Sequence, residues 1–400
     1  QNIYDNNGKI DMLTVVDQLR KNDDLEKAGG MYYITKLTQD VVSGANIETH
    51  ISIISEMYIK REAINQCAEL MTKAYQDSTD AFDIINEADN NFQKIQERVI
   101  GANAKDIKYY STNVINELYQ VQTSGVLGIP TKIKTLDKTI CGLVSPDLII
   151  LAARPGQGKT AAALSITYNT SVIDDIPCAW FSLEMNGTQL VRRLVSIDTG
   201  IDHELIRKGQ TTQDENEQIT YSAEKISHKN IFIEDKATMN IRDIRTRANL
   251  LKKKHGIKYI VVDYLQLMKG IGKTESRESE ISSISRGLKE IAKELDIPVI
   301  ALSQLSREVE KRGDKMPQLS DLRESGAIEQ DADIVMFIMR PEYYDMQNSI
   351  TIGKNEYDPK GLAIFNNAKN RHGKTGNIAL QFTGPTMRFS DHWNTTENPF

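Results

Sequence analysis

A glycine-containing loop between an apolar run and an alanine-rich segment carries the most specific chemistry in the sequence. The run Leu148–Ala153 predicts a strand, and the alanines after the loop favour a helix. The loop consists of Arg154, Pro155, Gly156, Gln157, Gly158, Lys159 and Thr160. In such a strand–loop–helix, backbone N–H groups surround a β-phosphate, a lysine reaches the β- and γ-oxygens, and a hydroxyl binds Mg²⁺. We therefore predict that these residues bind ATP, that Lys159 also acts in catalysis, and that Thr160 binds Mg²⁺.

Two carboxylates are expected near this loop because each follows a predicted strand. Asp263 ends the buried run Tyr259–Val262 and is predicted to hold the magnesium ion through water. Tyr264 comes next, where many ATPases with this loop have a glutamate that orients the attacking water, so the base must come from elsewhere. We assign that role to Glu184, which follows the strand that ends at Leu183. The alternative is that Glu184 caps the helix beginning near Gly187 or Thr188.

One further polar side chain is expected at the same edge of the sheet. Gln304 closes the run Val299–Leu302 after a serine, which places an amide where it could contact the γ-phosphate. We predict that Gln304 senses the γ-phosphate. The alternative is an amide in a solvated loop.

Short apolar runs alternate with helical segments from Pro146 onward, the pattern of a parallel sheet with crossover helices. The clearest predicted strands are Leu148–Ala153, Ala179–Leu183, Tyr259–Val262, Val299–Leu302 and Ile334–Ile338. Residues 362–368 and 378–389 are expected to add antiparallel strands. The fold class is therefore α/β, with a mostly parallel sheet.

The first quarter of the chain has a different pattern, with apolar residues such as Ile51, Ile54, Met57 and Tyr58 at helical spacing. We predict a small all-α domain over residues 1–102 and a linker over residues 103–127. The linker contains a docking helix that begins near Ser111 or Thr112. The α/β domain then occupies residues 128–400. The chain begins with Gln1, so the natural N-terminus is expected to lie upstream.

Composition limits the class of protein. With 400 residues, two domains are expected. No segment approaches the roughly 20 apolar residues of a membrane helix, and the 3 cysteines lack metal-ligand spacing, which favours the cytoplasm. A net charge of −6 does not exclude nucleic acid, since a channel can be lined with basic residues while the outer surface is acidic.

Five segments together resemble the DnaB family of replicative DNA helicases. They are Ala-Arg-Pro-Gly-Gln-Gly-Lys-Thr at 153–160, Phe-Ser-Leu-Glu-Met at 181–185, Val-Val-Asp-Tyr-Leu-Gln-Leu-Met at 261–268, Ala-Leu-Ser-Gln-Leu-Ser-Arg at 301–307, and the most specific, residues 321–333. The resemblance implies a RecA-like core and a homohexameric ring that hydrolyses ATP with Mg²⁺ and moves 5′ to 3′ on single-stranded DNA. It also implies a primase and a helicase loader as partners.

The resemblance also implies a finger that reaches ATP bound to the neighbouring subunit. The segment 365–371 resembles the family's finger strand, and Lys369 and Arg371 lie two residues apart, on the same face of a strand. A finger acting in trans can raise the rate by several orders of magnitude. Without the resemblance, an exposed basic strand end would be the favoured interpretation.

DNA contacts are implied for two loops. Arg323, Glu324 and Gly326 match family positions that touch the DNA backbone, although Asp321 and Arg323 could instead cap and pair at a short helix. Lys273 and Arg277 lie in a basic loop after the Asp263 strand. A solvated surface loop is an equal alternative for that segment.

Two rival functions remain open, and the chain departs from the family in two places. A strand-exchange recombinase shares the RecA-like core but forms open filaments, and a ring-shaped scaffold with a degenerate site would recruit primase without hydrolysing ATP. Compared with the family, the N-terminal domain lacks its first helices. The polar segment Asn348–Pro359 has no assigned role.

Overall fold

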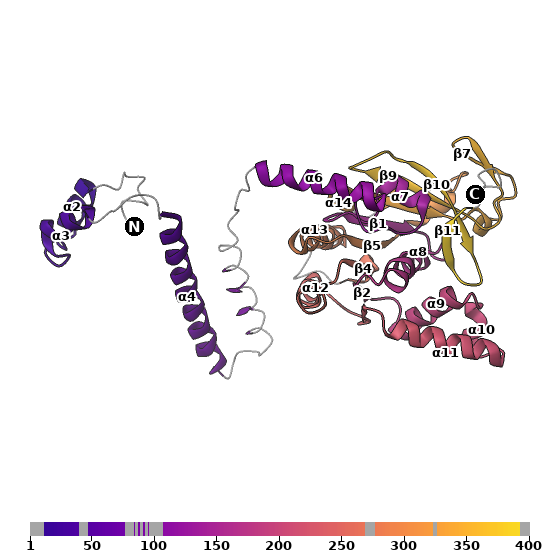
Figure 1. Ribbon diagram of the computed structural model, residues 1–400, viewed down its shortest axis with the longest axis horizontal. Coiled ribbons are helices and arrows are strands. Elements are labelled where there is room, and N and C mark those ends of the chain that lie inside the picture. Colours follow the sequence, from indigo (N-terminus) through magenta and orange to yellow (C-terminus); the bar gives the residue numbers. More distant parts are fainter. Residues whose placement is uncertain are drawn as a thin grey trace. The chain divides into compact units, whose positions relative to one another are not determined.

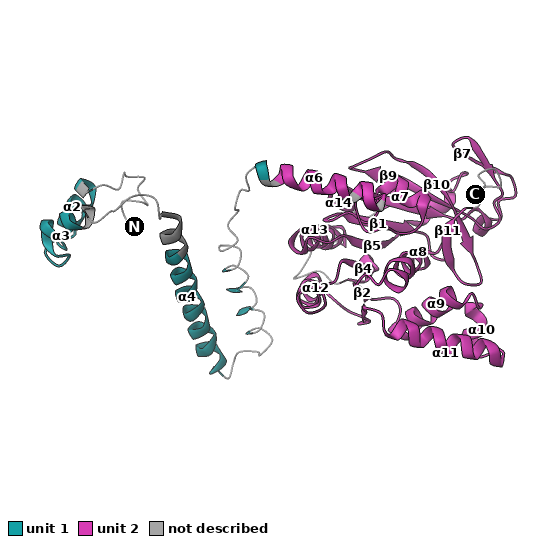
Figure 2. Ribbon diagram, viewed as in Figure 1, with its two compact units in different colours: residues 1–109 teal, residues 110–400 magenta. Residues whose placement is uncertain are grey.

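The computed structural model describes residues 12–39, 47–76, 107–268, 277–322 and 326–392, together with a few residues between 84 and 95. The chain divides into two compact units, residues 1–109 and 110–400, which are coloured separately in Figure 2. Each unit is described by itself.

The first unit is helical in the described residues, as the apolar spacing predicts. Its helices are α2 (Met12–Lys21), α3 (Gly30–Gln39) and α4 (Ile47–Ala74). Val16 of α2 and Ile34 of α3 are both buried. The 28-residue helix α4 leaves several apolar side chains exposed, including Ile54 and Ile64.

The predicted linker helix is present as α6 (Ile107–Ser124) and begins at Ile107 rather than near Ser111. Gly125 has a positive φ of 78° and ends it, with its N–H donating to the carbonyl of Val121 at 2.8 Å. The helix carries an exposed apolar stripe, whose members are Tyr110, Val114, Leu118 and Val121.

The second unit is built on a nine-stranded sheet with the order β11-β10-β9-β6-β1-β5-β4-β2-β3. Figure 1 labels β1, β2, β4, β5, β9, β10 and β11 of this sheet. The strands from β6 to β3 in this order are parallel, and β9, β10 and β11 add antiparallel pairs. The bounds are β1 (Leu148–Ala153), β2 (Cys178–Ser182), β3 (Ile231–Glu234), β4 (Tyr259–Asp263), β5 (Val299–Gln304), β6 (Ile334–Met339), β9 (Leu362–Asn370), β10 (Gly376–Thr383) and β11 (Arg388–Asp391). The predicted α/β class is confirmed.

Alternate residues of the central strands enter two separate cores, one on each face of the sheet. Ile149 and Leu151 of β1 face a core that includes α8 and α9, whereas Leu148 and Ile150 face a core that includes α12 and α13. Strands buried on both faces explain why the sequence shows continuous apolar runs rather than alternation. The helices are α7 (Lys134–Ile140), α8 (Lys159–Thr167), α9 (Gly187–Thr199), α10 (His203–Lys208), α11 (Gln213–Ser227), α12 (Ile241–His255), α13 (Arg277–Leu295) and α14 (Gly326–Asp331), with a π-helical turn over Tyr168–Ile173 and 3₁₀ turns over Leu265–Leu267, Arg307–Lys311, Leu319–Asp321 and Pro341–Tyr344.

The segment with no assigned role contains a small antiparallel hairpin of β7 (Ile350–Ile352) and β8 (Asn355–Tyr357). Ile350, Ile352 and Tyr357 pack against a minor apolar cluster that includes Met339 and Leu362. The segment therefore forms a separate two-stranded sheet that packs against this cluster. Among the described residues, no helix combines the length and the apolar character needed to cross a membrane.

Candidate functional site

The phosphate loop joins β1 to α8, as predicted, and two of its side chains reach two carboxylates. Lys159 Nζ lies 2.5 Å from Glu184 Oε2 and 3.0 Å from Asp263 Oδ1. The hydroxyl of Thr160 donates to Asp263 Oδ2 at 2.8 Å. Asp263 is fully buried, whereas the Glu184 side chain is 46% exposed. The structure therefore brings together four of the residues predicted for the nucleotide site.

The parallel arrangement of the strands explains why these four side chains lie together. Ser182 of β2 pairs with Asp263 of β4, and the N–H of Leu183 donates to the Asp263 carbonyl at 2.7 Å. Both strands end at the edge of the sheet where β1 enters the phosphate loop, so side chains that follow them converge there. Asn186, not Glu184, caps α9, because Asn186 and Gln189 form a reciprocal capping box. The alternative role of Glu184 as a helix cap is therefore wrong.

Gln304 lies beside the same loop. It pairs in register with Ala153 across β5 and β1, and the Leu305 N–H donates to the Ala153 carbonyl at 3.1 Å. Gln266 fixes the backbone here, because its Oε1 accepts from Gln304 N at 3.2 Å and its Nε2 donates to Ser303 Oγ at 2.9 Å. The strand end is thus held next to the phosphate loop.

The remaining residues of the loop have different surroundings. Arg154 is buried. Its Nε lies 2.7 Å from Glu310 Oε1, and its Nη1 donates to the Leu305 carbonyl at 2.8 Å. The guanidinium therefore links the phosphate loop to the segment that follows β5. Gln157 Oε1 accepts from Arg340 N at 2.7 Å. Pro155 and Gly156 are exposed.

The donor atoms fit a magnesium ion. A buried carboxylate and a hydroxyl 2.8 Å apart are hard oxygen ligands, the type that Mg²⁺ prefers alongside water and phosphate oxygens. Asp263 and Thr160 would hold the ion, which, when bound, would neutralise charge on the phosphate oxygens.

Two arginines near the loop were not predicted from the sequence. Arg193 of α9 has a buried Nε with no hydrogen-bond partner among the described residues, and burial lowers its pKa, while Asp263 and Glu184 act in the opposite direction. Arg340 follows β6, lies 3.8 Å over the Phe382 ring and donates to the Gly156 carbonyl at 3.3 Å. Arg340 could have been found as a basic residue that ends a parallel strand, whereas Arg193 lies in the interior of a helix.

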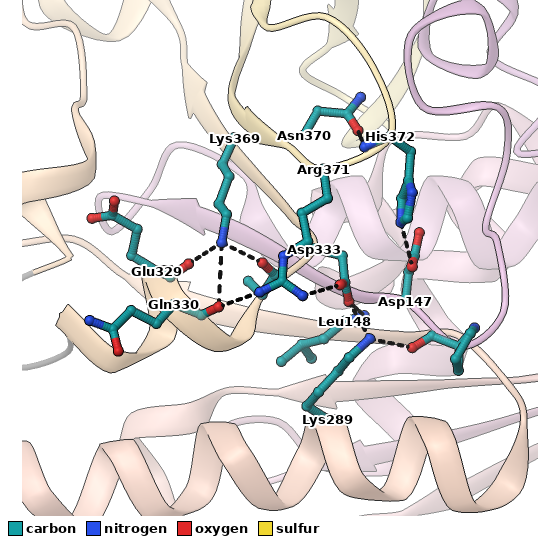
Figure 3. A network of polar contacts seen from close by, with 12 residues as sticks. Asp147, Leu148, Lys289, Glu329, Gln330, Asp333, Lys369, Asn370, Arg371 and His372 are labelled. Carbon is teal, nitrogen blue, oxygen red and sulfur yellow. Dashed lines mark hydrogen bonds and ion pairs between the residues drawn. The ribbon is translucent and has the colours of Figure 1, made fainter. Parts of the chain in front are cut away.

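The predicted finger residues lie together at another place on the sheet (Figure 3). Lys369 Nζ donates to the carbonyls of Glu329 and Ala332, the latter at 2.8 Å, and burial lowers its pKa, with the charge of Arg371 acting in the same direction. Arg371 Nη1 lies 3.1 Å from Asp333 Oδ1, and Nη2 donates to the Gln330 carbonyl at 2.9 Å. Both side chains therefore contact the C-terminal turn of α14 and the two residues that join it to β6.

The strand order places this pair far from the phosphate loop of the same chain. Asn370, the last residue of β9, pairs with Ile334, the first residue of β6, and β6 runs parallel to β1. Lys369 and Arg371 thus lie at the amino ends of the parallel strands, and the phosphate loop lies at their carboxyl ends. The 6-residue strand β1 separates the two edges by about 20 Å.

A group of potential metal ligands, Asp147, Asp333 and His372, lies beside the finger pair, with its ligand atoms within 4.8 Å of one another. Lys289 Nζ lies 2.6 Å from Asp333 Oδ2, and Arg371 contacts the other oxygen. These two cations already neutralise the carboxylate, so we interpret the group as an ion-pair cluster. Burial, followed by the nearby Asp333 charge, raises the pKa of Asp147.

The DNA-binding predictions fall largely outside the described residues. Arg323, Glu324 and Lys273 lie outside them, and Gly326 is the first residue of α14. Arg277 begins α13, where it pairs with Glu280 and donates to the Gln266 carbonyl. Asp321, the alternative partner of Arg323, is paired with Arg312.

Comparisons with known proteins give a consistent result. Residues 128–391 match the model of the DnaB-like helicase C terminal domain, and residues 1–56 match that of the DnaB-like helicase N terminal domain. The chain is 38% identical over 384 residues to the replicative DNA helicase DnaC of Bacillus subtilis, covering 95% of this chain and 82% of that protein. It is 37% identical over 391 residues to the replicative DNA helicase DnaB of Geobacillus stearothermophilus, covering 97% of this chain and 84% of that protein.

Two solved structures are similar to this one. The first is that of a DnaB-like replicative helicase and its interactions with primase, and it aligns with a TM-score of 0.72 and 30% identity over 98% of this chain and 89% of that chain. The second is an ATPase domain, which aligns with a TM-score of 0.67 and 35% identity over 73% of this chain and 100% of that chain.

Proposed function

Because the chain belongs to the DnaB family of replicative DNA helicases, which are ATP-dependent enzymes, we propose that it works as a homohexameric ring that translocates 5′ to 3′ on single-stranded DNA. Membership of this family excludes the strand-exchange recombinase and the non-hydrolysing scaffold. In the ring, each ATP lies between two subunits, one supplying the phosphate loop and the other the finger.

The separation of the two basic groups is the observation that supports this arrangement best. Lys159 lies at the carboxyl edge of the sheet, and Lys369 and Arg371 lie at the amino edge. A side chain of about 7 Å cannot bridge roughly 20 Å within one subunit. The finger can therefore serve a nucleotide only on another copy of the chain, which a ring provides.

Within one subunit, Lys159 and Glu184 have coupled roles. Lys159 pairs with Glu184 at 2.5 Å. The γ-phosphate of ATP carries more negative charge than one carboxylate, so Lys159 is expected to move toward it. Glu184, which is 46% exposed, can then accept the proton of a water molecule in line with the γ-phosphate. Gln304 at the end of β5 would sense that phosphate.

The transition state of phosphoryl transfer spreads charge over the γ-oxygens. The guanidinium of Arg371 and the ammonium of Lys369 from the neighbouring subunit would stabilise that charge. Asp263 and Thr160 would hold Mg²⁺, which would neutralise charge on the phosphate oxygens. Single-stranded DNA would contact Arg323, Glu324, Gly326, Lys273 and Arg277 through its backbone, with weak sequence preference.

Further proposals follow from the family. A primase is proposed as a partner because one of the similar helicase structures concerns interactions with primase, and a helicase loader is proposed by family resemblance. The cytoplasm is proposed as the location because replicative helicases act on the chromosome or on plasmid or phage DNA. The predicted bounds of 1–102, 103–127 and 128–400 remain our proposal for the collar, linker and motor.

The test is ATP hydrolysis with and without single-stranded DNA for Glu184→Gln, Arg371→Ala and a mixture of the two. Each variant alone is expected to lose at least about a thousandfold in DNA-stimulated rate. The mixture should recover part of the rate, because some interfaces then combine an intact Glu184 with an intact Arg371. Glu204→Gln and Arg207→Ala, whose side chains pair on the surface of α10, are the matched controls. A mixture as inactive as its components would exclude a finger in trans.

A further inference from the structure

The carboxylate of Asp333 is the contact centre of the finger region (Figure 3). Its Oδ2 accepts from Leu148 N at 2.8 Å and from Lys289 Nζ at 2.6 Å, and its Oδ1 lies 3.1 Å from Arg371 Nη1. The residue is only 3% exposed. All these partners are donors and two of them are cations, so both oxygens of the carboxylate take part in strong hydrogen bonds that fix its orientation.

The backbone of Asp333 is held as firmly as its side chain. Its N–H donates to the Leu148 carbonyl at 3.0 Å, and its carbonyl accepts from Arg371 N at 2.9 Å. Leu148 is the first residue of β1, in the buried centre of the sheet. The position of Asp333 is therefore fixed by hydrogen bonds to β1. Both the backbone N–H and the guanidinium of Arg371 contact Asp333.

The side chain of Arg371 is not enclosed in the way that a buried structural arginine is. Its side chain is 48% exposed, and its side-chain contacts use Nη1 toward Asp333 and Nη2 toward the Gln330 carbonyl. A guanidinium has five N–H donors in a fixed plane, so two contacts on one side fix its orientation and leave donors for a phosphate on the other. An arginine held in this way loses less freedom when it meets its ligand.

We propose that Asp333 is the positioning residue of the finger: it orients the Arg371 guanidinium for the γ-phosphate of ATP bound to the neighbouring subunit. This inference rests on the proposed finger in trans. Asp333 touches neither nucleotide nor DNA and acts only through Arg371. Removing its charge would leave Lys289 and Arg371 without their shared anion, and Arg371 would no longer have a fixed direction.

The experiment measures kcat and KM for DNA-stimulated ATP hydrolysis in the assembled protein for Asp333→Asn, Arg371→Ala and the double variant. Asparagine keeps the shape and an acceptor for Leu148 N but removes the charge. The matched control is Asp147→Asn, an equally buried aspartate at the same edge of the sheet that contacts His372 rather than Arg371. Thermal unfolding and oligomer size are recorded for every variant.

We expect Asp333→Asn to lower kcat about tenfold with KM for ATP within about twofold, because a misdirected finger loses a contact that is made mainly in the transition state and hardly affects the binding of ATP. The double variant should be no slower than Arg371→Ala, because Asp333 has no other route to the reaction. Asp147→Asn should keep kcat within about twofold. If Asp333→Asn does not assemble, Asp333→Glu keeps the charge but displaces the carboxylate, and the same loss in kcat is expected.

Two results would overturn the inference, and they can be distinguished from failure of the finger. If Arg371→Ala loses its activity while the Asp333 variant behaves like Asp147→Asn, Asp333 does not position the finger. Losses in kcat that multiply in the double variant lead to the same conclusion, because they place Asp333 on a separate route. If Arg371→Ala itself keeps kcat, the finger proposal is wrong, and this inference fails with it.

Discussion

At the scale of single residues, the phosphate loop depends on backbone shape as much as on Lys159 and Thr160. Gly158 has a φ of 97°, in the left-handed region that side chains with a Cβ rarely adopt. A Cβ at this position would lie 2.9 Å from Cζ of Phe389, a buried residue of β11. Glycine is therefore required for two independent reasons where the loop turns into α8.

The two reasons can be separated by comparing Gly158→Ala with Gly200→Ala, because only the backbone conformation requires glycine at position 200. Gly200, after α9, also has a positive φ of 76°, but nothing lies within 4 Å of its Cβ position. Both alanine variants should lose about 1–2 kcal/mol of unfolding free energy from backbone strain. Only Gly158→Ala should also weaken ATP binding, by about tenfold or more, because the ring of Phe389 must move or the loop must shift. Calorimetric titration with a non-hydrolysable ATP analogue measures the difference, and equal affinities for the two variants would show that the clash is relieved without cost.

At the scale of elements, the turn between β2 and α9 determines where Glu184 points. Glu184 lies two residues after the end of β2 and two before the helix cap Asn186. The capping box of Asn186 with Gln189, and the bond from Gly187 N to Asp235 Oδ2 at 2.8 Å, fix the start of the helix. The position of the proposed base therefore depends on a helix terminus.

Asn186→Ala should show this dependence when compared with Thr212→Ala, which removes an equivalent capping box from α11. Each substitution should lower the unfolding free energy by about 1 kcal/mol. Only Asn186→Ala should also lower kcat for ATP hydrolysis, severalfold, because the first turn of α9 then frays next to Glu184. Chemical denaturation and steady-state hydrolysis give the two measurements. Parallel behaviour of the two variants in both would mean that Glu184 is held by β2 alone.

At the scale of the whole molecule, two features support the proposed assembly of several copies of the chain. The finger residues and the phosphate loop lie at opposite edges of the sheet. The helix α6 leaves Val114 and Leu118 more than half exposed, at 54% and 59%. An apolar stripe of this kind is stabilised when another surface covers it, and assembly of identical chains supplies such a surface.

Replacing Val114 and Leu118 together by glutamate should weaken assembly, because charges would then line the apolar stripe. The melting temperature of the sheet-containing unit should stay unchanged, since both side chains are exposed. The rate of ATP hydrolysis per chain should fall at low protein concentration and recover as the concentration rises. Asn116→Glu, on the opposite face of α6, is the control. Sedimentation velocity follows the assembly, and an unaltered oligomer in the double variant would show that the stripe is not an interface.

The features that depend on neighbouring residues, or on one general rule of parallel sheets, could be predicted from the amino-acid sequence. The phosphate loop follows directly from a strand, a glycine turn and a helix that are contiguous in the chain. Asp263, Glu184 and Gln304 could be placed beside it because the carboxyl ends of parallel strands meet at one edge. The five sequence segments indicated the DnaB family, and the comparisons with known proteins confirm that family.

The features that depend on pairing between distant segments could not be predicted in this way and became visible in the folded chain. The side chain of Gln157 accepts from the backbone N–H of Arg340, which lies 183 positions later in the chain, and no local pattern specifies that contact. The direction of Arg193 depends on how α9 rotates against the sheet. The antiparallel pairing of β9 with β6 puts Arg371 next to Asp333 and on the far side from Lys159. A pair two residues apart shows that both side chains share a face, but the edge of the sheet that they occupy is fixed by strand order, which arises from packing between segments far apart in the chain.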